Sequence, residues 1–373
     1  MKIHTQMSIK YIFSLLFVTV VLSCKSVNTL PKEIFEINKL NFINEVIIPS
    51  DKMYEGAAVG GLSSIDYMDG KMYIISDDRK DPRFYMADIP IQGGKLQAPI
   101  FTKVVSLKDN TGLAFNAGQA DPESLRVTVS NDIIWSSEGN ISKGINPFIR
   151  VASIDGKFKN AFTIPSRYLV QSNDNSGPHN NGVFEALTRN YDNNGFWVAT
   201  ELPLKQDGIV PTASDANSPV RIAYIDHKRN TFTKEYAYML DKVARKGKLE
   251  VNGVTEILSY DKHSFLVLER SYASGHEDGG NDVKIYLVST KNATDVNDLN
   301  SLSNSAYIPA TKKLLLDFSS VRSQLTDGIV DNIEGMTFGP NFKNGNRSLI
   351  VISDNNFNSF GKQLSQIILF EIK

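Results

Sequence analysis

The sequence predicts an all-β fold, a β-propeller of four-stranded blades. Two observations carry this prediction: strand-like runs separated by turn signals throughout the chain, and a four-strand unit that recurs every 60–80 residues or so. With 373 residues, the chain is long enough to form one large domain with an ample core.

The predicted strands are short and rich in β-branched and aromatic residues, as in 71–76 and 132–136. Turn signals such as Asp192–Gly195 lie between paired runs, as hairpins require. Long stretches with a period of 3.6 residues are missing. Only the segments 236–243 and 319–325 are expected to form short helices.

The repeat consists of paired segments. Each unit opens with a polar or acidic residue before one strand and closes with an acidic residue at the end of the next. The five pairs are 61–66 with 75–79, 122–125 with 135–138, 184–187 with 198–201, 255–258 with 267–270, and 333–336 with 351–354. Four strand-like runs can be counted in the second unit, at 124–130, 133–137, 148–154 and 161–164.

Five such units account for the chain, so we expect five blades. The last unit has three strands of its own, ending with 366–372, and the run 42–48 would supply the fourth and close the ring. Six blades are the main alternative, because the insertions at 202–220 and 271–310 could contain further strands. A two-sheet sandwich would not explain why acidic residues recur at the same place in each unit.

The N-terminus has the features of a secretory signal. Lys2 and Lys10 precede an apolar run at 11–22, which is too short for a permanent membrane span. The run ends at Leu22-Ser23-Cys24, which resembles the lipobox of bacterial lipoproteins. This resemblance implies cleavage before Cys24 and lipidation of its thiol. The alternative is an ordinary signal peptide that ends near a cysteine.

We therefore expect a signal peptide at 1–23, a tether at 24–40 and a propeller domain at 41–373. The lipid anchor would hold the protein at a membrane of the bacterial cell envelope, on the periplasmic or outer-surface side. We expect the protein to be a monomer.

The composition excludes several classes of function. The 40 Lys and Arg balance 41 Asp and Glu, so the chain lacks the basic footprint of a nucleic-acid partner. A single Cys excludes a disulfide framework and multi-cysteine zinc sites. No G-x-S-x-G motif is present, which argues against a nucleophilic serine hydrolase.

In a propeller, the start of each first strand and the end of each second strand lie at the same edge of the blade. The acids expected to converge at this edge are Asp78, Glu123, Glu138, Glu185, Glu201, Glu256, Glu269, Glu334 and Asp354. So many carboxylates need counter-charges. Ca²⁺ could supply them, and so could Arg79, Arg126, Arg189 and Arg270. Alternatively, Glu–Arg pairs could hold the blades in register without any ligand.

The same segments carry a resemblance to a known family. Ser76–Arg79 followed by Arg83–Tyr85, Leu268–Arg270, Ile333–Met336 and Ser353–Phe357 together resemble the phytase-like domain family, also named for the esterase-like activity of phytase. The resemblance covers nearly all of the mature chain. It implies a secreted or envelope-bound propeller that hydrolyses esters or phosphoesters. The sequence departs from the family pattern at Ser63 and Asp66, where a Glu is expected, and at Ala186, where Gly is typical.

The functional hypothesis is a metal-assisted hydrolase of a small anionic or ester substrate. The expected Ca²⁺ ligands are Asp78, Glu138, Glu201, Glu269 and Asp354. The expected catalytic groups are Glu123, Glu185, Glu256 and Glu334, one of them as general base, with Arg79, Arg189 and Arg270 to bind the anionic group. The alternative is a non-catalytic propeller lipoprotein that binds a ligand or a protein.

Overall fold

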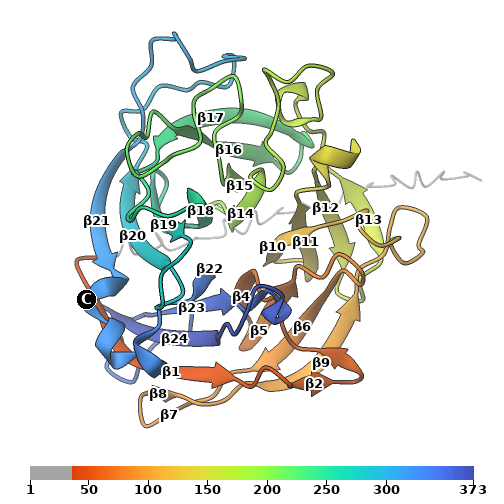
Figure 1. Cartoon of the computed structure of the whole chain (residues 1–373). Coiled ribbons are helices and arrows are strands. Elements are labelled where there is room, and N and C mark those ends of the chain that lie inside the picture. The colour runs from red at the N-terminus through yellow and green to blue at the C-terminus, as the bar shows by residue number, and fades with distance from the viewer. Residues whose placement is uncertain (1–35) are drawn as a thin grey trace, which may run out of the picture. The chain divides into compact units, whose positions relative to one another are not determined.

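The computed structural model describes residues 36–373, which form five four-stranded antiparallel sheets arranged as blades around a common axis (Figure 1). The predicted five-bladed β-propeller is confirmed. The six-bladed ring and the two-sheet sandwich are wrong, because the segments 201–218 and 290–310 contain no further strands.

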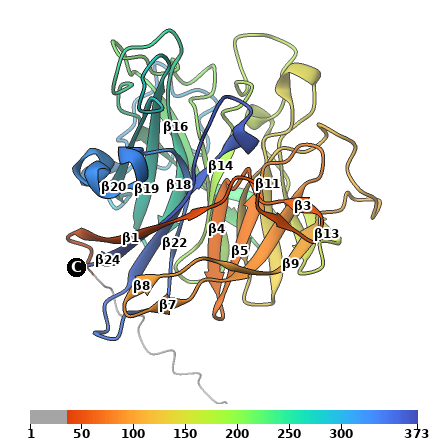
Figure 2. The same cartoon turned by 60° about the horizontal axis from the view of Figure 1, so that its bottom comes forward.

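Each blade is built from strands that follow one another from the axis outward (Figures 1 and 2). Blade 1 has β4 (Ser64–Met68), β5 (Lys71–Ser76), β6 (Arg83–Asp88) and β9 (Ile100–Ser106), and blade 2 has β10 (Pro122–Val127), β11 (Asp132–Ser137), β12 (Phe148–Ser153) and β13 (Phe158–Ala161). Blade 3 has β14 (Phe184–Arg189), β15 (Gly195–Thr200), β16 (Pro219–Asp226) and β17 (Thr231–Met239), and blade 4 has β18 (Glu250–Ser259), β19 (Ser264–Ala273), β20 (Asn281–Ser289) and β21 (Thr311–Asp317). Blade 5 has β22 (Asn332–Phe338), β23 (Ser348–Asp354), β24 (Ser365–Ile372) and β1 (Leu40–Ile48).

The remaining elements are short. Two small hairpins pair β2 (Met53–Tyr54) with β3 (Ala57–Ala58) and β7 (Ile91–Gln92) with β8 (Lys95–Leu96). The 3₁₀ turns are η1 (Ile141–Lys143), η2 (Ser166–Tyr168), η3 (Phe318–Ser320), η4 (Arg322–Gln324), η5 (Thr326–Gly328) and η6 (Asn356–Asn358).

The two predicted helices have different outcomes. The segment 319–325 is helical only as the 3₁₀ turns η3 and η4. The helix expected at 236–243 is wrong, because β17 runs to Met239 and pairs with β16. Tyr236, Ala237 and Tyr238 are consecutive buried residues. The segment therefore lacks the alternation of apolar and polar residues that identifies a strand in a sequence.

The ring closes as predicted. β1 pairs with β24 in antiparallel register from Leu40 opposite Ile372 to Ile48 opposite Ser365. The backbone N–H groups of Asn38 and Lys39 donate to the carbonyl of Lys373 at 2.7 and 3.1 Å. Strands from both ends of the described residues therefore share blade 5. Their pairing completes the fourth strand of this blade and closes the ring.

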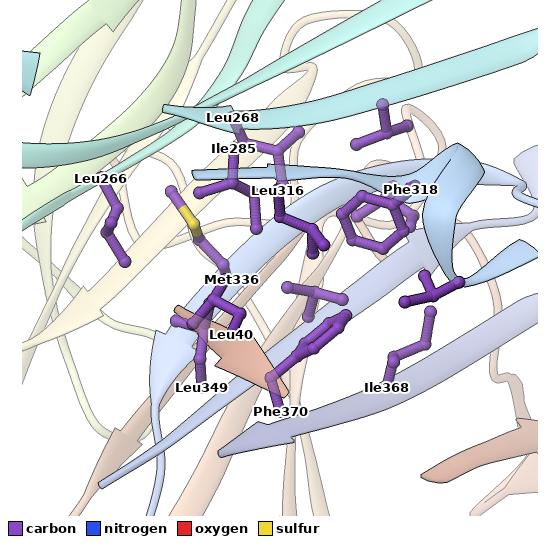
Figure 3. Packing of buried hydrophobic residues seen from close by; sticks show 14 of the residues in the cluster. Leu40, Leu266, Leu268, Ile285, Leu316, Phe318, Met336, Leu349, Ile368 and Phe370 are labelled. Atoms are coloured by element: carbon purple, nitrogen blue, oxygen red, sulfur yellow. The ribbon is translucent and has the colours of Figure 1, made fainter. Parts of the chain in front are cut away.

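Apolar side chains fill the spaces between neighbouring blades. Figure 3 shows the cluster between blades 4 and 5, in which Leu268 and Leu316 face Met336 and Phe370. The Phe370 ring meets Phe318 edge to face, with ring centroids 5.7 Å apart. Burial of this kind is the main source of stability that joins one blade to the next.

The predicted signal peptide, Cys24 and most of the predicted tether lie outside the described residues. Within residues 36–373, no helix is both long and apolar enough to cross a membrane.

We expect Phe370→Ala to lower the free energy of unfolding by about 3–5 kcal/mol, because it leaves a cavity between the blades. The Phe370 side chain is 0% exposed, whereas Phe360, ten residues earlier, is 85% exposed. Phe360→Ala is therefore the matched control, with an expected change below about 0.5 kcal/mol. Urea denaturation measures both, and equal effects would contradict the packing described here.

Candidate functional site

Irregular pairing shapes the start of several innermost strands. The register of pairing between the first two strands shifts between Pro122 and Leu125 in blade 2. It also shifts at Glu185 in blade 3 and at Glu334 in blade 5, where these residues have no partner in the neighbouring strand. An extra residue in one strand re-aims a side chain away from the ladder. Glu123, Glu185 and Glu334 lie at these irregularities, at the same end of their blades.

The second strands end at this edge. Asp77 and Glu138 directly follow β5 and β11, Glu201 follows β15, and Asp354 is the last residue of β23. Asp121, directly before β10, lies at the same edge. We call this group the acidic mouth: Asp77, Asp121, Glu123, Glu138, Glu185, Glu201, Glu334 and Asp354, together with Arg79 and Arg270.

Three carboxyl groups in blade 2 have the geometry of a cation site. Asp121, Glu123 and Glu138 are buried, and one oxygen from each lies within 4.8 Å of the others. The backbone N–H groups of Gly182 and Val183 both donate to Glu138 Oε1 at 2.5 Å, which fixes this side chain. Carboxylate oxygens are the ligands that hard divalent cations prefer, so this triad could hold a metal ion.

Two arginines partly balance the negative charge. Arg79 contacts Asp121 at 2.5 Å, and its side chain is 45% exposed. Arg270 contacts Glu201 at 3.0 Å and Glu334 at 3.6 Å. Eight carboxyl groups thus face two guanidinium groups, which leaves the acidic mouth with excess acid.

This crowding raises pKa values. Burial, followed by the charges of Glu201 and Asp121, raises the pKa of Glu138 to about 8. Burial also raises the pKa of Glu334 to about 8, although the positive charge of Arg270 opposes it. The pKa values of Glu123 and Glu185 are raised well above the usual range, again first by burial and then by neighbouring carboxylates.

Three of these carboxyl groups have no partner among residues 36–373. Within the described residues, the carboxyl oxygens of Asp77, Glu123 and Glu185 make no hydrogen bond and no ion pair, and Asp77 Oδ1 is buried. An unpartnered acidic group in a buried setting is costly. A bound cation, or a proton, would satisfy all three.

Six of the nine carboxylates expected to converge do lie in the acidic mouth, and Glu256 does not. In blade 4 the ladder skips Thr255, one residue before Glu256. Glu256 is therefore paired within the strand ladder and contacts Arg126 at 2.6 Å and Ser64 at 2.9 Å. This buried pair links blades 4, 2 and 1.

Glu269 is also absent from the mouth, because the strands of blade 4 are longer. β19 continues to Ala273, so Glu269 lies within the strand, where it accepts from Tyr238 at 2.5 Å and pairs with Lys312 at 2.7 Å. The next residue, Arg270, points to the opposite face and enters the acidic mouth.

The remaining two predicted residues have their own partners. Asp78 pairs with Arg83 at 2.7 Å, and the adjacent Asp77 occupies the mouth in its place. Arg189 lies at the far end of β14 from Glu185, where it pairs with Asp66 and donates to the Val127 carbonyl. It therefore lies away from the mouth.

Sequence reasoning missed Asp77 and Asp121. A signal for Asp121 was present, because Asp121 and Glu123 are two residues apart and residues at this spacing share a face of an extended strand. For Asp77 and Asp78, the choice depends on how the chain turns after β5, which the sequence does not reveal.

The family described as phytase-like, esterase-like activity of phytase, matches residues 57–357. The chain belongs to this family. The match spans all five innermost strands and every residue of the acidic mouth. No curated protein matches the chain.

Solved structures with a similar fold are distant. Endo-arabinase from Bacteroides thetaiotaomicron is 10% identical, covers 83% of this chain and 93% of its own, and has a TM-score of 0.45. A glycosyl hydrolase from Bacteroides ovatus is 12% identical over 91% and 92% of the two chains, with a TM-score of 0.42. The major allergen Mala s 1 of Malassezia sympodialis is 10% identical over 84% and 93%, with a TM-score of 0.38.

The raised pKa values predict how stability depends on pH. In the folded protein Glu334 keeps its proton up to about pH 8, whereas unfolded Glu loses it near pH 4.5. Between these values the folded state binds more protons, so the free energy of unfolding should fall as the pH rises from 5 to 8 in chelator. Glu334→Gln should reduce this slope in urea titrations.

Glu371→Gln is the control for this experiment. Hydrogen bonds from Asn344 and Asn346 lower the pKa of Glu371 to about 2, so its stabilising contribution is lost only below about pH 4.5. The slope between pH 5 and 8 should therefore be unchanged in this variant. A Glu334→Gln slope equal to that of the wild type would contradict a protonated Glu334.

Proposed function

We propose that this phytase-like protein is a metal-assisted hydrolase of a small phosphoester or ester substrate, with its active site at the acidic mouth. The observation that supports this most is that, among residues 36–373, Asp77, Glu123 and Glu185 have no partner, and that Glu123 belongs to a triad with metal-ligand geometry. A purely structural ring of Glu–Arg pairs would leave no such groups.

Asp121, Glu123 and Glu138 would hold the cation, and the hard oxygen donors favour Ca²⁺. A cation bound there would neutralise negative charge on the substrate and lower the pKa of a bound water molecule. Arg79 lies beside the triad and its side chain is half-exposed, which suits it to bind a phosphate or carboxylate group.

Glu185 is the best candidate for the general base. It is one of the unpartnered carboxyl groups, and its charge interacts with those of Glu138, Glu201 and Glu334. Burial and these neighbouring charges raise the pKa of Glu185, which makes its carboxylate a stronger base than an ordinary one. Arg270 would hold Glu201 in place by ion pairing, and it also lies beside Glu334.

We further propose that the protein is a monomeric lipoprotein of the bacterial cell envelope, anchored through Cys24 after removal of residues 1–23, with no nucleic-acid partner. The signal-like N-terminus and the position of the only Cys support this proposal. In the producing bacterium, we expect the wild type to partition into detergent and Cys24→Ala to partition into the aqueous phase. Equal partitioning of both would contradict lipidation.

Activity tests the main proposal. Purified protein should hydrolyse phytate or p-nitrophenyl phosphate with Ca²⁺ present, and chelator should abolish the activity. Glu138→Gln keeps an oxygen that can accept from Gly182 and Val183 but removes a charged ligand, so we expect a loss of about 100-fold or more.

Arg229→Ala is a suitable control, because Arg229 is 73% exposed in the β16–β17 turn, at the opposite end of the blades. Its activity should match that of the wild type. If Ca²⁺ raises the melting temperature but no phosphoester or ester is turned over, the protein is a binding propeller and the hydrolase proposal is wrong.

A further inference from the structure

Phe357 has a backbone conformation that is unfavourable for a bulky residue. It lies in η6, after β23, with a φ of 49°, between Asn356 at 44° and Asn358 at 56°. Asn tolerates this left-handed region, whereas Phe carries a steric penalty there. Contacts with the rest of the protein must therefore hold Phe357 in place.

These contacts are with blade 1. The Phe357 ring packs on Gly60, where an added Cβ would lie 3.0 Å from Phe357 Cδ1. The guanidinium of Arg83 lies 5.8 Å from the ring centroid. Asn355 Oδ1 accepts from the N–H groups of Phe357 and Gly61, both at 3.1 Å. The β23–β24 turn of blade 5 is thus fastened to blade 1.

The Phe357 ring and the Asp77 carboxyl group lie on the same side of Gly61, around the space that a Cβ would fill. A Cβ on Gly61 would overlap both Phe357 Cε2 and Asp77 Oδ1. The Asp77 N–H donates to the Gly61 carbonyl at 2.8 Å, which fixes the backbone of the two residues together. Because the Asp77 carboxyl group has no hydrogen-bond partner among residues 36–373, steric contact with Gly61 and the Phe357 ring constrains its orientation.

We propose that Phe357 is a positioning residue: packed beside Asp77 in the space left by the missing Cβ of Gly61, its ring holds the Asp77 carboxyl group in the orientation needed to contact a cation bound at the acidic mouth. The cation belongs to the proposed function. The mechanical coupling between Phe357 and Asp77 does not depend on it, so the two ideas can fail separately.

A double-mutant cycle tests the coupling. Phe357→Gly removes the ring and relieves the backbone penalty, so it should fold at least as well as the wild type yet weaken Ca²⁺ binding about tenfold by calorimetry. In an Asp77→Asn background, Phe357→Gly should have no further effect on Ca²⁺ affinity. Phe357→Tyr keeps the ring and should restore the affinity of the wild type.

Two glycine variants provide a matched comparison. Gly61 and Gly56 both have positive φ, at 60° and 82°, but a Cβ on Gly56 would meet nothing within 4 Å. Both Ala substitutions therefore carry a similar backbone penalty, and only Gly61→Ala displaces Asp77. We expect Gly61→Ala to weaken Ca²⁺ binding about tenfold and Gly56→Ala to leave it unchanged.

Additive effects of Phe357→Gly and Asp77→Asn on Ca²⁺ affinity would overturn the positioning role, as would equal effects of the two glycine variants. If the wild type binds no Ca²⁺, the proposed function fails. The cycle is then measured on the free energy of unfolding in chelator, where non-additive effects support the coupling and additive effects reject it.

Discussion

Like-charge crowding at the end of the propeller axis is the constraint on which the site depends. Five blades bring the starts of their first strands and the ends of their second strands to one edge. Eight carboxyl groups gather there, with two arginines as protein counter-charges. Burial weakens the solvation that would otherwise stabilise ionised carboxylates, so protons or cations must balance the remaining charge.

The blades do not contribute equally to this site. Blade 2 supplies three close carboxyl groups, whereas blade 4 supplies Arg270 and no acid. The difference follows from a one-residue change in the position of the ladder irregularity and from the longer strands of blade 4. The same sequence pattern thus yields a triad of possible metal ligands in blade 2. In blade 4 it yields the positively charged side chain of Arg270, which contacts neighbouring carboxyl groups of the mouth.

The junction of blades 5 and 1 joins fold to site. β1 and β24 pair within blade 5 and close the ring along its outer edge, and the Asn355–Phe357 turn fastens blade 5 to blade 1 at the mouth. Deeper in the ring, the ion pair of Glu256 and Arg126 ties blade 4 to blade 2. Acid–arginine pairs therefore serve the scaffold in one layer, while unpartnered acids mark the candidate site in another.

The sequence alone determined the fold class, ring closure by 42–48 and six acids of the mouth, and it favoured five blades over six. These follow from strand periodicity and a repeat, which are local properties of the chain. Tertiary structure decided that Asp77, not Asp78, enters the mouth and that Glu256, Glu269 and Arg189 pair elsewhere. The physical reason is that side-chain direction depends on where each ladder skips a residue and each strand ends. Both are set by pairing with a neighbouring strand, because a shift of one residue sends a side chain to the opposite face.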